Sequence, residues 1–340
     1  MSWPSFWEQK NWISRLLTPL SKLTCWEAKR RLDKAVAQSV DPNVPVIVVG
    51  NLVVGGSGKT PFITWLALQL QQRGLRVGLV ARGYGGQAKQ WPQVVGSHSD
   101  PVLVGDEPVM LVKSLGCPMV VGPKRQQAVQ TLLEEADVDV IISDDGLQHH
   151  AMHRDLEIVL VDAKRQFGNG QCLPAGPLRE GLSRLESVDF VVVNGANTQQ
   201  TAQIMQPFAA AQKSFAMQLQ PQAFVHLLSG KTKPVDAFAG VAVNALAAIG
   251  NPQRFFDTLS DLGVSVKAHP FVDHYGFDSA SLSVFENNKP LLMTHKDAVK
   301  CAAFAQTGDD WWYLSVAAQI EERLLEQILQ SLDLSHQSMN

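Results

Sequence analysis

The chain has 340 residues, of which 45% are apolar, and a formal net charge of -3 at pH 7. This length and composition exclude a disordered chain and predict a globular protein with two domains. The near-neutral charge excludes a protein-wide basic field, so we expect no nucleic-acid partner.

Cysteine spacing and hydropathy exclude further classes. None of the four cysteines has C-x-x-C spacing, which argues against a disulfide framework or a zinc site and suits a reducing cytosol. They are Cys25, Cys117, Cys172 and Cys301. No apolar run reaches the roughly 18 to 20 residues that cross a bilayer, and the N-terminus lacks the apolar core of a standard signal peptide.

The first segment, residues 1–42, is rich in tryptophan. It carries four of the eight tryptophans in the chain, namely Trp3, Trp7, Trp12 and Trp26. Apolar residues recur there at a helical period and are flanked by lysines and arginines. The pattern predicts an amphipathic helical segment. From the residues alone, it fits a helix at a membrane surface and a helix packed on the next domain equally well.

Residues 43–222 read as a sheet of buried strands alternating with helices. Near-continuous β-branched runs are typical of a parallel sheet that is covered on both faces, and they occupy residues 44–51, 76–83, 118–122, 138–145, 156–163 and 189–195. We therefore expect a P-loop NTPase-like three-layer α/β/α domain with a mainly parallel sheet. A polar stretch around residues 199–222 interrupts the pattern. A smaller α/β domain is expected over residues 223–325, followed by a tail over 326–340.

The stretch "GGSGKT" lies between a predicted strand and a predicted helix over residues 59–74. Backbone amides of a glycine-rich turn bind phosphates at a helix N-terminus, and the residues placed to do so are Gly55, Gly56, Ser57 and Gly58. Lys59 is expected to reach the β and γ phosphates of ATP, and the Thr60 hydroxyl to bind Mg2+. Val53 stands where the common pattern has its first glycine.

A nucleotide site of this kind needs a carboxylate at the end of a neighbouring strand to hold Mg2+. Asp144 and Asp145 follow the apolar run that ends at residue 143, and they are the preferred candidates. Asp162 ends the next strand and is the alternative. The histidines of "DDGLQHH" lack a further ligand pair at zinc-binding spacing.

Other polar motifs follow predicted strands, and strand ends in a doubly wound sheet gather at one edge. "ARGYGG" contributes Tyr84, and "GDEP" contributes Asp106 and Glu107. "GPKRQQA" places Arg125 at a helix start. Gln148 follows the acidic pair, and "LPAGPLRE" carries Arg179 and Glu180 on a stiff loop.

Taken in order, these motifs resemble those of the tetraacyldisaccharide 4'-kinases, the lipid A 4'-kinases of Gram-negative bacteria. The resemblance runs from about residue 10 to 325 and includes "GNLVVGGSGKTP", "DDGLQHH", "PAGPLRE", "IGNPQRFF", "FVDHYGF" and "THKDAVK". The chain departs from the family pattern at three positions, Val53, Ala248 and His295. No chemistry is assigned to these three residues.

The resemblance implies transfer of the ATP γ-phosphate to the 4'-hydroxyl of a tetraacylated glucosamine disaccharide 1-phosphate, at the cytoplasmic face of the inner membrane. Lys59 and Arg125 would neutralise phosphate charge, and Thr60, Asp144 and Asp145 would hold Mg2+. Asp106 would accept the hydroxyl proton, paired with His274 of the second domain.

Four further residues are candidates for substrate binding because all could reach the same crevice, and which of them contacts nucleotide, metal or sugar stays open: Tyr84, Glu107, Gln148 and Glu180. Because the acceptor is anchored in lipid, the resemblance favours the membrane-docking interpretation of residues 1–42. It implies no obligate protein partner.

Two alternatives remain from the residues. One is a membrane-associated ATPase switch of the partitioning type, although Val54 stands where that class has its signature lysine. The other is a P-loop kinase for a different lipid or sugar.

Overall fold

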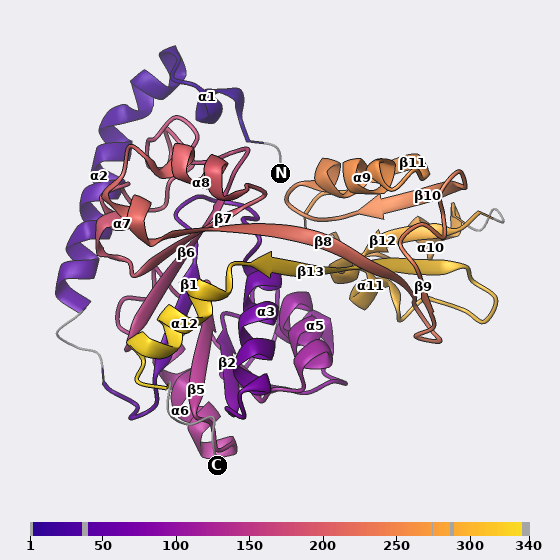
Figure 1. The fold of residues 1–340 in the computed structure, drawn as a ribbon, viewed down its shortest axis with the longest axis horizontal. Coiled ribbons are helices and arrows are strands. Elements are labelled where there is room, and N and C mark those ends of the chain that lie inside the picture. Colours follow the sequence, from indigo (N-terminus) through magenta and orange to yellow (C-terminus); the bar gives the residue numbers. More distant parts are fainter. Residues whose placement is uncertain (1–2, 36–39, 274, 286–288, 335–340) are drawn as a thin grey trace.

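The computed structural model describes residues 3–35, 40–273, 275–285 and 289–334. Two lobes lie side by side and are joined by a ribbon of two long strands, while a long N-terminal helix lies along the outer side of the first lobe (Figure 1). His274, predicted above as a partner of the catalytic base, lies outside the described residues.

The first lobe is built on a mainly parallel sheet. Its strands, in spatial order, are β7 (Phe190–Asn194), β6 (Leu156–Asp162), β1 (Val46–Gly50), β5 (Val140–Asp144), β2 (Val77–Ala81), β4 (Met119–Val121) and β3 (Gln93–Val95). Only the edge strand β3 runs antiparallel to its neighbour. Every residue of the other six strands is buried, as the β-branched runs predict for a sheet covered on both faces.

Helices cover both faces of this sheet. One face packs against α3 (Lys59–Gln72), α5 (Asp106–Leu115) and α12 (Glu322–Ser331). The other packs against α6 (Arg125–Glu135), α7 (Arg184–Ser187) and α8 (Thr198–Met205). The short helix α4 (Pro101–Val104) precedes α5, and a 3-10 turn, η2 (Ala209–Lys213), follows α8. The predicted three-layer α/β/α fold is confirmed.

The second lobe continues the same hydrogen-bonded sheet. Its strands follow in the order β11 (Ser265–Pro270), β10 (Ala242–Ala247), β12 (Leu291–Thr294), β13 (Trp311–Ile320) and β8 (Ser214–His226), with β9 (Thr232–Lys233) beside β8. Its helices are α9 (Pro252–Asp261), α10 (Ser279–Ser283) and α11 (His295–Cys301). Two apolar clusters, one on each face, form its core.

Strands β8 and β13 connect the lobes. The start of β8 pairs in parallel with β7, while most of its length pairs antiparallel with β13, with an irregular register between Ser315 and Val316. The sequence analysis expected only a polar interruption over residues 199–222 and a domain boundary at 222. That boundary falls inside β8, whose glutamines at 218, 220 and 222 are exposed while the residues between them are half-buried. The stretch is a strand with one solvent-facing side and not a polar interruption.

The expected C-terminal tail also differs from the structure. Helix α12 extends to Ser331, and Leu324, Leu325 and Ile328 are fully or almost fully buried against the sheet of the first lobe. The last turns of the described chain therefore belong to the first core, although they follow the second lobe in sequence. The apolar side of this helix requires a partner, and the sheet face provides it.

The N-terminal segment forms α1 (Ser5–Glu8) and α2 (Trp12–Ala35), so the predicted helical segment is confirmed. On one side it contacts the first lobe: the Trp3 indole donates to the carbonyl of Val54 at 3.1 Å, and that of Trp7 to Pro174 at 3.0 Å. On the other side, large apolar residues at helical spacing are exposed, namely Trp12, Leu16, Leu20, Leu23 and Trp26. Among the described helices, none is long and apolar enough to cross a membrane.

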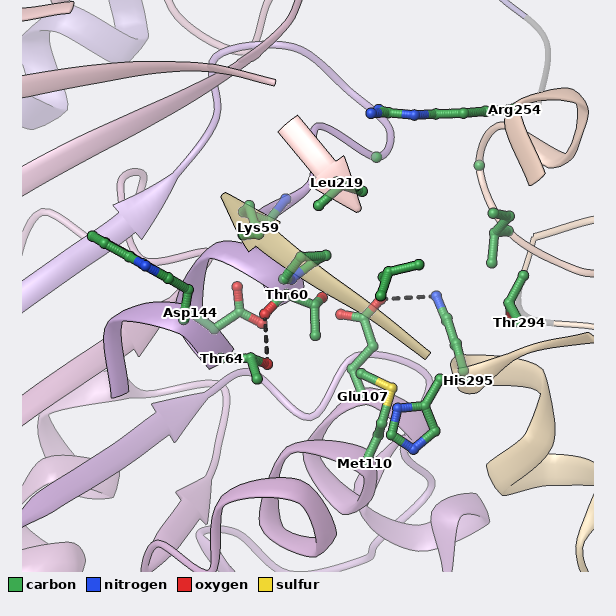
Figure 2. A pocket seen from close by; sticks show the side chains of 18 of the residues that line it. Lys59, Thr60, Thr64, Glu107, Met110, Asp144, Leu219, Arg254, Thr294 and His295 are labelled. Atoms are coloured by element: carbon green, nitrogen blue, oxygen red, sulfur yellow. Dashed lines mark hydrogen bonds and ion pairs between the residues drawn. The ribbon is translucent and has the colours of Figure 1, made fainter. Parts of the chain in front are cut away.

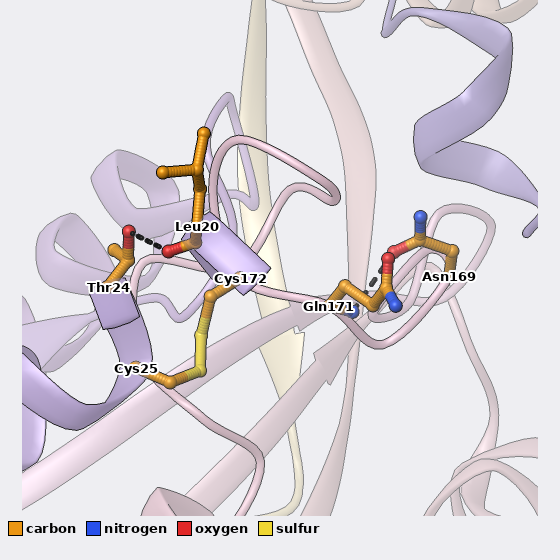
Figure 3. Close-up of a disulfide and its surroundings, with 6 residues drawn as sticks. All are labelled: Leu20, Thr24, Cys25, Asn169, Gln171 and Cys172. Atoms are coloured by element: carbon orange, nitrogen blue, oxygen red, sulfur yellow. Dashed lines mark hydrogen bonds between the residues drawn. A yellow bond between two sulfur atoms is a disulfide. The ribbon is translucent and has the colours of Figure 1, made fainter. Parts of the chain in front are cut away.

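Cys25 of α2 and Cys172 of the loop before α7 form a disulfide (Figure 3). The prediction that the cysteines form no disulfide was therefore wrong for this pair. The two residues are 147 positions apart in sequence, and their Cα atoms are 6.0 Å apart only because α2 packs along this loop. Spacing rules detect local motifs and cannot detect such a tertiary contact. Cys117 and Cys301 are free and buried.

Candidate active site

The loop after β1 has the backbone shape of a phosphate-binding loop. Gly58 caps α3 with a φ of 92°, a conformation that side chains disfavour, and a Cβ there would lie 2.2 Å from the Asn194 amide nitrogen. Asn194 in turn donates to the Ser57 carbonyl at 3.0 Å. The Asn51 amide donates to the Gly55 carbonyl at 3.0 Å. Side chains from two strand ends therefore fix the loop before any ligand binds.

Lys59 is held at the start of α3 by two acceptors. Its ammonium donates to Asn51 Oδ1 at 3.2 Å and lies 3.3 Å from Asp145 Oδ1. Arg179 Nη1 approaches both Asp145 oxygens, at 3.0 and 2.9 Å. Burial raises the pKa of Asp145, but Lys59 and Arg179 outweigh burial and lower it well below its ordinary value. Asp145 is therefore ionised and orients the lysine that is expected to reach phosphates.

Asp144 ends β5 beside this pair. Its Oδ1 is buried and has no hydrogen-bond partner among the described residues. Burial, followed by the nearby charge of Glu107, raises its pKa to about 7. A buried carboxylate oxygen without a donor is costly unless a cation completes it. In the described part of the chain, no group of three His, Cys, Asp or Glu could hold a metal. Asp144 and Thr60 line the same cavity, and a single carboxylate with a hydroxyl fits an ion such as Mg2+, which keeps several waters.

Asp106 and Glu107 are the first two residues of α5 and face the second lobe. The ammonium of Lys296, from α11, lies 2.8 Å from Glu107 Oε1, and that of Lys300 lies 4.0 Å from Asp106 Oδ2. Asp106 is almost fully buried. The two carboxylates thus lie between the phosphate loop and the cationic helix of the second lobe.

These groups line one large cavity between the lobes, with a volume of about 1570 Å³ (Figure 2). Sequence-predicted residues that line it are Gly55, Gly56, Lys59, Thr60, Tyr84, Asp106, Glu107, Asp144 and Asp145. Tyr84 is exposed at 65% and lies at the rim. Asp273, Thr294, His295 and Lys296 line the wall from the second lobe. Trp3 and Trp7 also line the cavity, so the N-terminal segment reaches its edge.

Arg125 is placed differently from the expectation. It is 2% exposed, and its guanidinium donates to the carbonyl oxygens of Gly122 at 2.6 Å and Asp144 at 3.2 Å. Burial lowers its pKa to about 10. In this structure Arg125 therefore supports the backbone at the ends of β4 and β5 and does not line the cavity. Its motif at a helix start could not reveal that the side chain turns inward.

Gln148 and Glu180 lie behind the cavity wall. Gln148 accepts from Arg179 at 3.2 Å and donates to Glu180 at 2.7 Å. Glu180 lies 3.3 Å from Arg184, which also pairs with the buried Glu157. These side chains orient Arg179, which in turn orients Asp145. Neither Gln148 nor Glu180 lines the cavity, and in this structure they act through Arg179.

Four residues of the site were missed by the sequence analysis. Asn51 and Asn194 hold the phosphate loop, and Arg254 and Lys296 bring positive charge from the second lobe. Asn51 lies inside the quoted "GNLVV", and the two cations lie inside "IGNPQRFF" and "THKDAVK". The motifs were recognised, but only the three-dimensional placement shows which members face the cavity.

A phosphate loop, a buried acidic pair at a strand end and a second lobe that covers them define a P-loop kinase. The family model of Tetraacyldisaccharide-1-P 4'-kinase matches residues 13–333. The chain belongs to this family.

Curated relatives and a solved structure agree with this assignment. The chain is 52% identical to the tetraacyldisaccharide 4'-kinase of Hydrogenovibrio crunogenus, over 93% of both chains. It is 44% identical to that of Actinobacillus pleuropneumoniae serotype 5b, over 96% of this chain and 99% of the relative. A crystal structure of LpxK from Aquifex aeolicus in complex with ATP has a TM-score of 0.76, at 30% identity, and covers 94% of this chain and 99% of that one.

Proposed function

We propose that this kinase transfers the γ-phosphate of ATP to the 4'-hydroxyl of a tetraacylated glucosamine disaccharide 1-phosphate, giving the 4'-phosphorylated lipid A precursor. The observation that carries the proposal is the single cavity in which the phosphate loop, the acidic pair and Asp106 converge. The curated relatives are named tetraacyldisaccharide 4'-kinases, which supports an acylated disaccharide as the substrate class. A cavity open to both lobes has room for a nucleotide and a sugar acceptor.

Phosphoryl transfer depends mainly on positioning and on neutralising charge. Lys59 binds the β and γ phosphates, and the loop amides of Gly55, Gly56, Ser57 and Gly58 surround them. Thr60 and Asp144 hold Mg2+, with Asp145 in support. When bound, Mg2+ neutralises phosphate charge and orients the transferred group. The unpartnered, buried Oδ1 of Asp144 supports this assignment.

Asp106 is assigned as the base that accepts the proton of the 4'-hydroxyl. General-base catalysis of this kind contributes roughly 10²- to 10⁴-fold to a rate. Its burial and its position between the two walls support the role. His274 is assigned as its partner on the family motif "FVDHYGF" alone, since it lies outside the described residues. Asp273 precedes His274 in sequence and lines the cavity, and we assign it the role of tuning the ring.

The exposed apolar side of α2 is assigned to the membrane surface. Trp12 is 73% exposed and Leu16 is 72% exposed. A continuous stripe of exposed apolar side chains of this size is rare on the surface of a soluble protein. Lysines and arginines on the same helix suit anionic lipid headgroups. We place the protein at the cytoplasmic face of the inner membrane, where an acyl-anchored acceptor would be presented.

One assay separates this function from its rivals. The full-length protein is incubated with Mg2+, ATP labelled at the γ position, and vesicles that contain the disaccharide 1-phosphate. Label in the lipid supports the proposal. Label that appears only as inorganic phosphate would favour an ATPase switch, and transfer to a different lipid or sugar would favour another kinase.

The membrane role has a separate test. Trp12→Ser combined with Leu16→Ser removes apolar side chains that are already exposed, so the fold should persist. We expect the double variant to release from anionic vesicles in a flotation assay while it still binds ATP. Vesicle binding equal to that of the unaltered protein would refute the docking role.

A further inference from the structure

Helix α11 of the second lobe packs against α5 of the first lobe, across the cavity. Lys296 is the second residue of α11, and Asp106 and Glu107 begin α5. The Lys296 ammonium lies 2.8 Å from Glu107 Oε1 and 3.5 Å from Asp273 Oδ1. One ammonium therefore touches carboxylates from both lobes.

The charges around this contact would oppose closure without a cation. Asp106 and Glu107 belong to the first lobe, and Asp273 belongs to the second. Carboxylates that share one cation repel one another, and water screens this repulsion only in part, since the side chains of Glu107 and Asp273 are 32% and 27% exposed. Burial lowers the pKa of Lys296, but Glu107, Asp106 and Asp273 outweigh burial and raise it above its ordinary value. Lys296 is therefore a cation at any working pH.

Lys296 is presented by a rigid helix start. Thr294 caps α11 and donates its hydroxyl to Asp297 at 2.6 Å. Asp297 is fully buried, accepts from the Ala248 amide at 3.0 Å and lies 2.9 Å from Lys300. These bonds attach the N-terminus of α11 to the end of β10. Lys300 is thus paired within its own lobe, whereas the close partner of Lys296 is in the opposite lobe.

We propose that Lys296 is a positioning residue that holds the two lobes closed over the acceptor, through its bridge from Glu107 to Asp273. Closure of the lobes brings the second-lobe wall against Asp106. The closed lobes also exclude water from the site of phosphoryl transfer. The inference rests on the proposed assignment of Asp106 as the base. Lys296 acts through the carboxylates and the lobe spacing, and contact with ATP is not required.

The first test is the steady-state kinetics of the full-length protein with vesicles that contain the disaccharide 1-phosphate. Lys296→Met keeps much of the stem of the side chain and removes the charge. We expect kcat to fall by about 10²-fold, because small misplacements of reacting groups slow a reaction by about this factor. The KM for ATP should stay within about twofold, because binding in the ground state is retained. Lys296→Arg should recover kcat to within about tenfold of the unaltered protein, since it keeps the charge. Lys267→Met, an exposed lysine of the same lobe, is the matched control.

Lobe spacing is measured separately, with spin labels on cysteines introduced at the exposed positions Glu135 and Asp261. The native free cysteines are buried, which limits unwanted labelling. We expect one narrow distance in the unaltered protein and a longer, broader distribution in Lys296→Met. An unchanged distribution, or a kcat within threefold of the unaltered value, would overturn the inference, as would a loss that Lys296→Arg does not rescue. The spin-label distance between the lobes does not depend on which residue is the catalytic base. If Lys296→Met changes this distance but Asp106→Asn leaves turnover intact, the assignment of Asp106 fails and the closing role of Lys296 stands.

Discussion

The first-lobe wall of the cavity holds its charged groups through contacts within its own lobe, whereas the second-lobe wall presents cations that contact the opposite lobe. The phosphate loop is fixed by Asn51 and Asn194, and Lys59 is held by Asp145. The second lobe contributes Lys296 and Arg254, each of which has a partner in the first lobe. The difference suggests a division of tasks: the first wall is organised to bind nucleotide before the lobes close, and the second wall completes the site.

The largest expected effect comes from a change where the two walls meet. Asp106→Asn keeps the size of the side chain and removes the base, so turnover should fall by roughly 10²- to 10⁴-fold. ATP binding, which depends on the first wall, should be unchanged by calorimetry. Asp257→Asn, an exposed carboxylate of the second lobe, is the control. Turnover close to that of the control would remove Asp106 from the mechanism.

A change within the first wall should affect binding and turnover together. Lys59→Met removes the cation that reaches phosphates and leaves Asp145 with Arg179 as its cation. We expect kcat/KM to fall by about 10²- to 10³-fold, comparable to removal of one transition-state donor, with weaker ATP binding. Lys89→Met, at an exposed position, should change neither quantity. An intact affinity for ATP in Lys59→Met would contradict the assignment of phosphate binding to this wall.

The acidic pair of the first wall makes stability depend on pH and Mg2+. The ordinary pKa of an aspartate is 3.8, and that of Asp144 in the folded chain is about 7. Between these two pH values, the metal-free folded protein keeps a proton on Asp144 that the unfolded chain has lost. Stability of the metal-free protein should therefore fall as pH rises from about 4 to 7. Mg2+ binds the ionised carboxylate, so it should raise Tm by a few degrees at pH 8 and by little at pH 5.

Asp144→Asn is the matched variant for this measurement. The amide cannot ionise, so both the fall in stability and the response to Mg2+ should disappear. Differential scanning calorimetry with and without Mg2+ provides the readout. An Mg2+ effect that is equal at both pH values, or that survives in Asp144→Asn, would assign the metal to another group.

The smallest effect is expected at the more exposed cation of the second wall. Arg254 donates to Asn194 at 3.0 Å and lies 3.6 Å from Asp162, but its side chain is 36% exposed. Exposed pairs contribute roughly 0 to 1 kcal/mol, so Arg254→Met should raise the KM for ATP by about threefold with little change in kcat. A loss as large as that of Lys59→Met would show that the two walls share nucleotide binding equally.

The strands and the site motifs of the first lobe could be predicted because their physical signals are local. A strand buried on both faces is a continuous apolar run, and "GGSGKT" between a strand and a helix has few other uses. Strand ends meet at one edge, which placed Asp144, Asp106 and Lys59 together before the structure did.

The features that were missed depend on contacts between distant residues. In β8, exposed glutamines alternate with half-buried residues, and the partner that covers the half-buried side, β13, comes about 100 residues later in sequence. Arg125 was assigned to phosphate from its motif, yet it turns inward to the carbonyls of Gly122 and Asp144. The Cys25–Cys172 disulfide and the packing of α12 join segments far apart in sequence. No local pattern encodes such neighbours.

The ribbon of β8 and β13 also determines the length of the connection between the two lobes. Hydrogen bonds run between its two strands, so the pair resists shear, yet it has no third strand along its middle to prevent bending. The second lobe can therefore bend and twist relative to the first lobe, while the length of the ribbon between them stays fixed. The length of the connection is consequently a property of the main chain, whereas the angle at which the lobes close over the cavity depends on side-chain contacts such as that of Lys296 with Glu107.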